Sequence, residues 1–269
     1  MTKISVIVNC RVEGNPNCGL KNLIRSIEEN TKNALAVEVL IKFDTDDKGA
    51  PEMVAWLTDR ISICDYHWIV EPRGRGYIDI HHGYNRLLQH IDKDTLIVGA
   101  MGDDFLVLPG WDVALMDIVN VRDSDDIYII HQRPHPPSQR LDIESNRFSM
   151  DFPMFDRMEE LFIVDEAPFW SRGLLNAVTW LGGGLSFTDG WTLCLEYALW
   201  QNHRRNITYF TAGQIVKRVL DQVDMPDNER WTGDRRTNFD YMRSPYFRAI
   251  VANQAKNVAN RFLIPGRLR

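Results

Sequence analysis

Short apolar runs rich in β-branched residues alternate with helix-forming segments through the first hundred residues, and this alternation constrains the fold more than any other feature. Such runs occupy residues 4–8, 37–43, 67–72 and 95–101, and the first reads ISVIV. The first run is typical of a strand buried on both faces of a parallel sheet, and the other three are also expected to be strands. Between them, residues 20–30, 51–60 and 78–91 have the residue spacing of helices.

The repeated alternation predicts an α/β fold with a mostly parallel central sheet flanked by helices. In such sheets ligands bind beyond the carboxyl ends of the strands. Here those ends are residues 9–11, 44–47, 73–76 and 102–104, which are rich in polar and charged side chains. We therefore expect the functional site at this edge. The second half is less regular, with a strand expected at 126–132 and helices at 191–203 and near the C-terminus.

The composition indicates a folded, soluble chain. Of 269 residues, 44% are hydrophobic and 25% are charged, which is close to the globular average and excludes global disorder. No run approaches the roughly 18 apolar residues that a membrane helix needs, so we expect no transmembrane segment. The N-terminus lacks the pattern of a signal peptide, and four scattered cysteines without a C-x-x-C pair fit a reducing compartment. Together these features predict a cytoplasmic location.

The charge is unevenly distributed along the chain. The net charge is −6, but residues 230–269 hold nine arginine and lysine residues against two aspartates, a local charge of +7. An acidic body argues against broad nucleic-acid binding. The basic C-terminal arm could contact phosphates, an anionic membrane surface or the acidic body itself.

The sharpest local motif is the acidic pair Asp103–Asp104, which follows Gly102 at the end of the fourth predicted strand. Two carboxylates at a strand end offer the hard oxygen ligands that Mg²⁺ or Mn²⁺ prefers. The alternative is an ordinary solvated turn. The position of the pair, between a buried strand and the apolar stretch FLVLPGWD, favours the metal site.

The stretch HHGYNRLLQHIDKDTLIVGAMGDDFLVLPGWDVAL carries a wider pattern: a helix with Asn85, a strand, the acidic pair and then Pro109-Gly110-Trp111. This pattern resembles the nucleotide-sugar signature of family-2 glycosyltransferases, which belong to the nucleotide-diphospho-sugar transferase superfamily and have the GT-A (Rossmann-like) fold. The resemblance covers residues 3–115 and continues loosely to about 215. It implies that Asp104 contacts the metal and that Asp103 aids it or faces the ribose. Gly102 departs from the family pattern, in which an acidic or amide residue begins the motif.

The resemblance also implies a set of nucleotide-binding residues at the strand ends, namely Cys10, Arg11, Asp44, Arg75 and Asn85. Cys10 and Arg11 would cradle the base, and Asp44, or Asp46 if the alignment slips, would accept a hydrogen bond from base or ribose. Arg75 lies in RGRG, where glycines permit close approach and a guanidinium can bind phosphate bidentately, although an exposed basic turn is the alternative. Asn85 could equally be an ordinary helix residue.

A catalytic base is expected downstream, because transfer to a hydroxyl needs a carboxylate to accept its proton. The stretch LGGGLSFTDGWTLCLE looks like the acceptor-side segment of the family, which makes Asp189 the candidate base. Asp189 could also cap the following helix, a role that aspartate performs well. Glu196 is a weaker alternative.

The sequence thus predicts an inverting, Mg²⁺- or Mn²⁺-dependent glycosyltransferase that uses a nucleotide-diphosphate sugar and a glycan or other hydroxyl-bearing acceptor. Residues 1–110 would form the nucleotide-sugar-binding half, 111–225 a smaller acceptor-binding half of the same domain, and 226–269 the basic C-terminal arm. Two alternatives stay open. One is a nucleotidyltransferase on a similar scaffold, and the other is a non-catalytic carbohydrate- or nucleotide-binding module.

Overall fold

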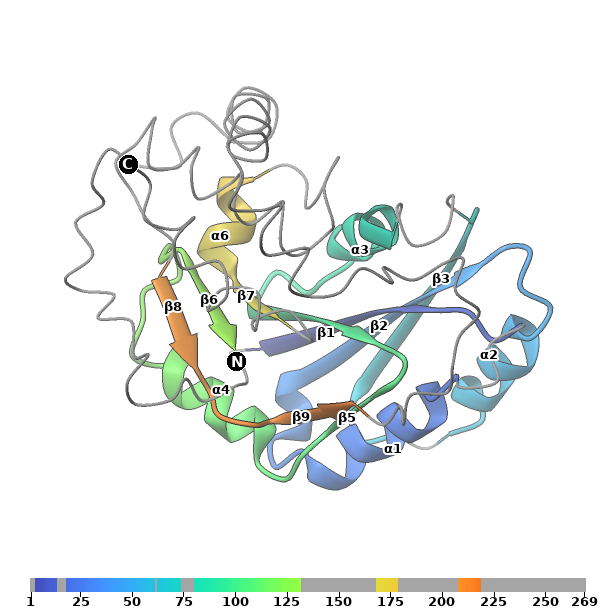
Figure 1. The fold of residues 1–269 in the computed structure, drawn as a ribbon, viewed down its shortest axis with the longest axis horizontal. Helices are drawn as coiled ribbons and strands as arrows, with labels where there is room; N and C mark the ends of the chain where they lie inside the picture. The colour runs from blue at the N-terminus through green and yellow to red at the C-terminus, as the bar shows by residue number, and fades with distance from the viewer. Residues whose placement is uncertain are drawn as a thin grey trace, which may run out of the picture.

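A seven-stranded, mostly parallel sheet forms the centre of the computed structural model, which describes residues 3–13, 18–60, 62–73, 80–131, 168–178 and 208–218. Its strand order is β3-β2-β1-β4-β7-β6-β8 (Figure 1). β1 pairs in parallel with β2 and β4, β2 with β3, and β6 with β8, whereas β7 runs antiparallel to both of its neighbours. The order and direction confirm the predicted α/β fold.

The sheet strands span the following residues: β1 Lys3–Cys10, β2 Val37–Asp44, β3 Asp65–Glu71, β4 Thr95–Gly102, β6 Tyr128–His131, β7 Phe169–Ser171 and β8 Thr208–Thr211. A separate two-stranded antiparallel ribbon joins β5, Phe105–Val107, to β9, Val216–Arg218. Because β5 begins directly after the acidic pair, the ribbon ties that pair to a segment more than a hundred residues later.

The described helices cover both faces of the sheet. They are α1 Leu20–Asn30, α2 Ala50–Thr58, α3 Ile80–Leu88, α4 Trp111–Val119 and α6 Arg172–Ala177, with a short 3₁₀ turn at Ala34–Ala36. In Figure 1, α1, α2 and α4 lie below the sheet, and α3 and α6 lie above it. No helix in these described segments is long and apolar enough to cross a membrane.

The core lies mainly between the sheet and α1. Alternate residues of β1 point to this side, where Ile4, Val6 and Val8 are fully buried. The apolar residues of α1 recur three and four apart, so that its buried positions form one face: Leu20, Leu23, Ile24 and Ile27. This burial, rather than intrinsic helix propensity, stabilises an eleven-residue helix.

Close packing at two glycines brings neighbouring elements together. A Cβ on Gly83 of α3 would lie 1.9 Å from Oδ1 of Asn9, so α3 can approach the end of β1 only because residue 83 lacks a side chain. A Cβ on Gly99 of β4 would lie 2.4 Å from the fully buried ring of Phe169 in β7. Glycine thus sets the distance between these elements.

The predicted strands and helices of the first hundred residues are confirmed, with ends that differ by a few residues, and the strand expected at 126–132 is β6. The sequence did not predict β5, β7, β8, β9, α4 or α6. These strands have three or four residues each, too few for a clear alternation. The helices expected at 191–203 and near the C-terminus lie outside the described residues.

Candidate active site

The carboxyl ends of β1, β2 and β4 meet at one edge of the sheet. In the parallel register Cys10 lies beside Phe43, and Asn9 lies beside Gly102. In the sequence, Arg11 follows Cys10, Asp44 follows Phe43, and Asp103 follows Gly102. The topology therefore brings together the predicted residues of three separate segments, as the strand order β2-β1-β4 requires.

Arg11 joins two of the predicted carboxylates. Its Nη1 donates to Oδ2 of Asp44 at 3.1 Å and to Oδ1 of Asp46 at 3.0 Å. These contacts raise the pKa of Arg11 and lower the pKa of Asp46, in each case chiefly through the hydrogen bond that the two side chains share. Lys42 also donates to Asp44, so this buried carboxylate faces two cations. Both alternatives for the nucleotide-binding carboxylate thus contact the same arginine.

Asp47 braces the loop that follows β1. Its carboxylate accepts hydrogen bonds from the backbone N–H groups of Val12 at 2.7 Å, Glu13 at 2.9 Å and Gly49 at 3.0 Å. The Asp47 side chain is buried, and these bonds satisfy it. Asp47 therefore fixes the loop after Arg11 against the segment that leads into α2.

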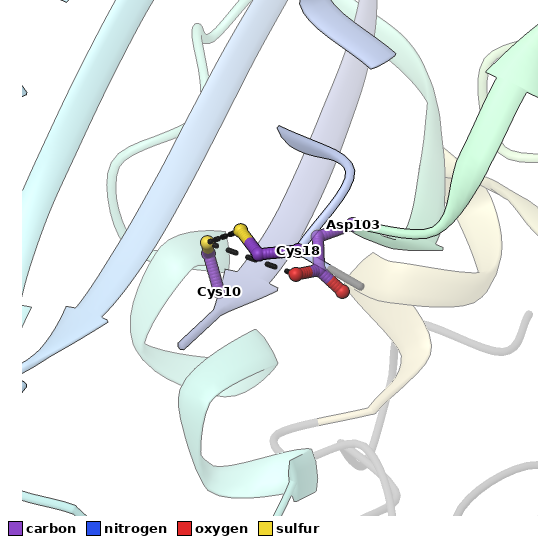
Figure 2. A group of neighbouring side chains, drawn as sticks. All are labelled: Cys10, Cys18 and Asp103. Carbon is purple, nitrogen blue, oxygen red and sulfur yellow. Dashed lines mark hydrogen bonds between the residues drawn. The ribbon is translucent and has the colours of Figure 1, made fainter. Parts of the chain in front are cut away.

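Asp103 lies with two thiols at the ends of different segments (Figure 2). Sγ of Cys10 lies 3.7 Å from Sγ of Cys18 and donates to Oδ2 of Asp103 at 3.9 Å. Cys10 ends β1, Cys18 lies two residues before α1, and Asp103 follows β4. The three side chains form a group in which every ligand atom lies within 4.8 Å of the others.

The electrostatics of this group are strongly perturbed. Burial, with the neighbouring Cys18 next in importance, raises the pKa of Asp103 to about 8. The hydrogen bond with Cys10 lowers the pKa of Cys18 to about 6, and the backbone N–H of Leu20 at the start of α1 contributes in the same direction. The pKa of Cys10 is raised, first by its hydrogen bond to Cys18 and then by burial. The shared hydrogen bond therefore shifts the pKa values of the two thiols in opposite directions.

Asp104 has different neighbours from Asp103. A Cβ on Gly102 would lie 2.4 Å from Oδ1 of Asp104, so this carboxylate occupies the space that a side chain at position 102 would take. Asp104 is half-buried at the rim of the sheet. The two adjacent carboxylates therefore lie in different environments: Asp103 contacts the thiol of Cys10, and Asp104 lies over Gly102.

Helix α3 supports the same edge from the other face. Asn85 is buried in α3, and Oη of the neighbouring Tyr84 donates to the backbone carbonyl of Met101 at 3.2 Å. Arg86 forms an ion pair with Glu71 at 3.0 Å. The Tyr84 hydrogen bond holds α3 against β4 just before the acidic pair, and the Arg86 ion pair holds it against the end of β3.

The Pro109-Gly110-Trp111 part of the motif has a structural role. Gly110 has a φ of +78°, a left-handed conformation that favours glycine, and it precedes α4. Trp111 is fully buried, and its Nε1 donates to Oγ1 of Thr31 at 3.0 Å. Asp112 accepts from the backbone N–H groups of Lys32 and Asn33. The motif thus locks α4 onto the end of α1.

Two predicted site residues, Arg75 and Asp189, lie outside the described residues, as do Glu196 and the basic C-terminal arm. The structure brings together Cys10, Arg11, Asp44, Asp103 and Asp104 at the ends of neighbouring strands. The sequence reading missed Cys18 and Asp47. Their only signal was position, because both lie in the loops that directly follow predicted strands.

Comparisons with known proteins rest on structure alone. No family model and no curated protein sequence matches the chain. The solved structures it resembles include a mannosyltransferase from Pyrobaculum calidifontis, PcManGT, in complex with GDP-Man and Mn²⁺. That match has a TM-score of 0.56 and 14% identity, and covers 94% of this chain and 69% of the mannosyltransferase.

A second similar structure is TarS from S. aureus, with a TM-score of 0.52 and 13% identity. The match covers 82% of this chain but only 37% of TarS, so the chain spans little more than a third of that protein. At identities this low, the structural matches establish similarity of fold alone. The chain therefore has a mixed α/β structure with a GT-A glycosyltransferase-like fold.

Proposed function

We propose that the chain is a glycosyltransferase that moves a sugar from a nucleotide-diphosphate donor to an acceptor hydroxyl. The observation that carries this proposal is the position of Asp103–Asp104 at the carboxyl end of β4, in a GT-A sheet and beside the Arg11–Asp44 pair. Ligands of open α/β sheets bind at this edge. The GDP-Man complex of the similar mannosyltransferase supports a nucleotide-sugar donor.

The acidic pair fits a hard divalent ion. Carboxylate oxygens at a half-exposed rim are suitable ligands for Mg²⁺ or Mn²⁺, which keep room for water and for the oxygens of a substrate phosphate. Asp104, aided by Asp103, would hold the ion. When bound, such an ion stabilises negative charge on a leaving diphosphate. The Mn²⁺ in the mannosyltransferase complex supports the same class of ion.

The nucleotide would lie along the ends of β1 and β2. In our proposal Asp44 accepts a hydrogen bond from the ribose or base, and Arg11 holds that carboxylate in place through its 3.1 Å ion pair. Cys10 lies under the base, and Asn85 keeps α3 against this edge. Arg75, in a glycine-rich loop, would bind the diphosphate.

The acceptor would be activated by Asp189. As its oxygen attacks the anomeric carbon, the hydroxyl gives its proton to this carboxylate, and a single displacement of the nucleoside diphosphate inverts the configuration. Residues 111–225 would bind the glycan or other acceptor, whereas residues 1–110 bind the donor. The basic arm at 226–269 would contact an anionic surface.

A thermal-shift screen of GDP, UDP and other nucleoside diphosphates, each with and without Mn²⁺, tests this proposal. A ligand that binds only the native state raises the Tm in proportion to ln(1 + [L]/Kd). We expect one diphosphate to raise Tm in wild type with Mn²⁺ and to raise it much less in Asp104→Asn. Failure of every nucleotide to shift the Tm would contradict the proposal.

Product analysis with the matching sugar donor separates the remaining functions. Release of a nucleoside diphosphate supports glycosyl transfer, whereas release of pyrophosphate identifies a nucleotidyltransferase. Nucleotide binding without turnover at any Mn²⁺ concentration identifies a non-catalytic binding module.

A further inference from the structure

We propose that Cys10, Cys18 and Asp103 form a binding site for a thiophilic divalent ion of the zinc class, separate from the Mg²⁺ or Mn²⁺ site proposed at Asp104. This inference does not rest on the proposed function, because the three ligands are brought together by the fold itself. It would hold for a transferase and for a binding module alike.

The spacing of the ligand atoms fits one ion. Two sulfurs bound at about 2.3 Å to tetrahedral zinc lie about 3.8 Å apart, and a sulfur and a carboxylate oxygen lie about 3.5 Å apart. Here the Cys10 and Cys18 sulfurs are separated by 3.7 Å, and Sγ of Cys10 lies 3.9 Å from Oδ2 of Asp103. Small side-chain adjustments would therefore complete the site without movement of the backbone.

The backbone around the three ligands is held by independent contacts. Cys10 is the last residue of β1, which pairs with β2 and β4 on its two sides. Gly19 packs directly on the chain at Asp103, since a Cβ at position 19 would lie 2.5 Å from the Asp103 carbonyl oxygen. The carbonyl of Gly19 in turn accepts from Asn22 and Leu23 in the first turn of α1. The segments that carry the ligands are thus preorganised.

The chemistry of the ligands selects the ion. Thiolates prefer zinc and similar soft or borderline ions, whereas Mg²⁺ and Mn²⁺ prefer oxygen. The backbone N–H of Leu20 donates to Sγ of Cys18, and such outer-shell hydrogen bonds orient metal ligands. Asp103 contacts Cys10 through Oδ2 and directly precedes Asp104, so it lies at the border between this site and the proposed Mg²⁺ or Mn²⁺ site.

The fourth position would be open. Zinc sites with three protein ligands keep one position for water or for an atom of a bound ligand. These three residues lie at the carboxyl ends of β1 and β4, the edge where ligands of α/β sheets bind. A zinc-class ion here would join β1, β4 and the start of α1 at the floor of the candidate active site.

Cobalt binding to the full-length chain provides a direct test. Apo protein is kept reduced with a phosphine, its free thiols are counted, and Co²⁺ is added stepwise. We expect the near-ultraviolet band of sulfur-to-cobalt charge transfer and the strong visible bands of tetrahedral cobalt to saturate at one Co²⁺ per chain, and both to be displaced by Zn²⁺. Reduced, folded wild-type protein that shows no charge-transfer band would overturn the proposal.

Single variants locate the site. Cys10→Ser and Cys18→Ser should each weaken the charge-transfer band and reduce affinity by at least the roughly 10–100-fold lost when outer-shell partners of metals are mutated. Asp103→Asn should keep the band but bind more weakly. Cys18 and Asp103 are only partly buried, so these two variants test the site even if Cys10→Ser does not fold.

The two remaining cysteines supply matched controls. Cys64→Ser, in a buried thiol outside the cluster, and Cys194→Ser should leave the cobalt spectrum unchanged. Asp104→Asn should also keep it, while losing the Mn²⁺-dependent nucleotide shift. A charge-transfer band of undiminished intensity and affinity in both Cys10→Ser and Cys18→Ser, or one that disappears in Asp104→Asn, would show that the thiophilic site is not the one proposed.

Discussion

The carboxylate of Asp104 lies where a side chain on Gly102 would have to be, because a Cβ at position 102 would approach Oδ1 of Asp104 to 2.4 Å. The glycine that departs from the family pattern therefore has a physical reason in this chain. An acidic residue at 102 and the present position of Asp104 exclude each other. Where the family pattern has an acidic or amide side chain, this chain has Gly102, and the carboxylate of Asp104 occupies the space that such a side chain would need.

We predict that Gly102→Ala displaces Asp104 and weakens Mn²⁺-dependent nucleotide binding. The clash involves the end of a flexible side chain, so the carboxylate should move while the Tm without ligand changes little. The readout is the Tm shift with Mn²⁺ and the best-binding nucleoside diphosphate. If the alanine acts through Asp104, Gly102→Ala combined with Asp104→Asn binds no more weakly than Asp104→Asn alone. Additive losses would argue for a separate effect.

The Gly99→Ala variant should destabilise the fold by about 1–3 kcal/mol, the usual cost of overpacking a core. The added methyl group would lie 2.4 Å from Cε1 of Phe169, whose ring is fully buried. Urea denaturation measures the change. Combining it with Phe169→Leu should restore part of the loss, since the smaller side chain relieves the contact; a double variant with the full summed loss would contradict this explanation.

Asp47→Ala should reduce the free energy of unfolding by about 1–3 kcal/mol, because three backbone donors lose their acceptor. Its neighbour Asp46 is exposed and pairs with Arg11 at the surface. Asp46→Ala is therefore the matched control and should change stability little. Equal losses in the two variants would show that the loop does not depend on Asp47.

Stability should fall with rising pH above about 9 through Cys64. Burial raises the pKa of this thiol from its ordinary 9.0 to about 12. Between these values the unfolded chain has lost the proton and the folded chain has kept it, so higher pH favours unfolding. Urea midpoints from pH 8 to 11 should fall less steeply in Cys64→Ala than in wild type. Parallel curves would rule out this thiol as the cause.

Asp189→Asn should abolish sugar transfer while donor binding persists. A base acts on the acceptor proton and does not touch the nucleotide, so kcat falls and the Mn²⁺-dependent Tm shift with nucleotide is unchanged. Single-turnover transfer and thermal shift measured on the same preparation check both parts. Undiminished transfer would assign Asp189 to the alternative role of helix cap.

The sequence allowed the parallel half of the sheet to be predicted because its strands are long and apolar. The carboxyl ends of parallel strands lie at one edge of a sheet, so the meeting of Arg11, Asp44 and the acidic pair at that edge could be expected, whereas the strand order came from the structure. The contact between Cys10 and Cys18 could not be predicted, since it depends on the path of the loop between them. Nor could the position of the Asp104 carboxylate over Gly102, since it depends on the conformation of that side chain.

The short strands could not be predicted from the sequence for a different reason. β7 is defined by its partners β4 and β6, and its three residues carry no period of their own. The motif alone did not say what Trp111 contacts. In the structure its burial and its bond to Thr31 make it part of the packing between α1 and α4.

The β5–β9 ribbon has a mechanical consequence. Phe105, the residue directly after Asp104, pairs with Arg218, and the backbone N–H of Leu108 donates to the carbonyl of Ile215 at 2.8 Å. The acidic pair is thus anchored on one side by the central sheet and on the other by residues near position 216. Truncating the chain before residue 216 would remove the second anchor and leave residues 103–104 held by the central sheet alone, although every residue of the motif would still be present.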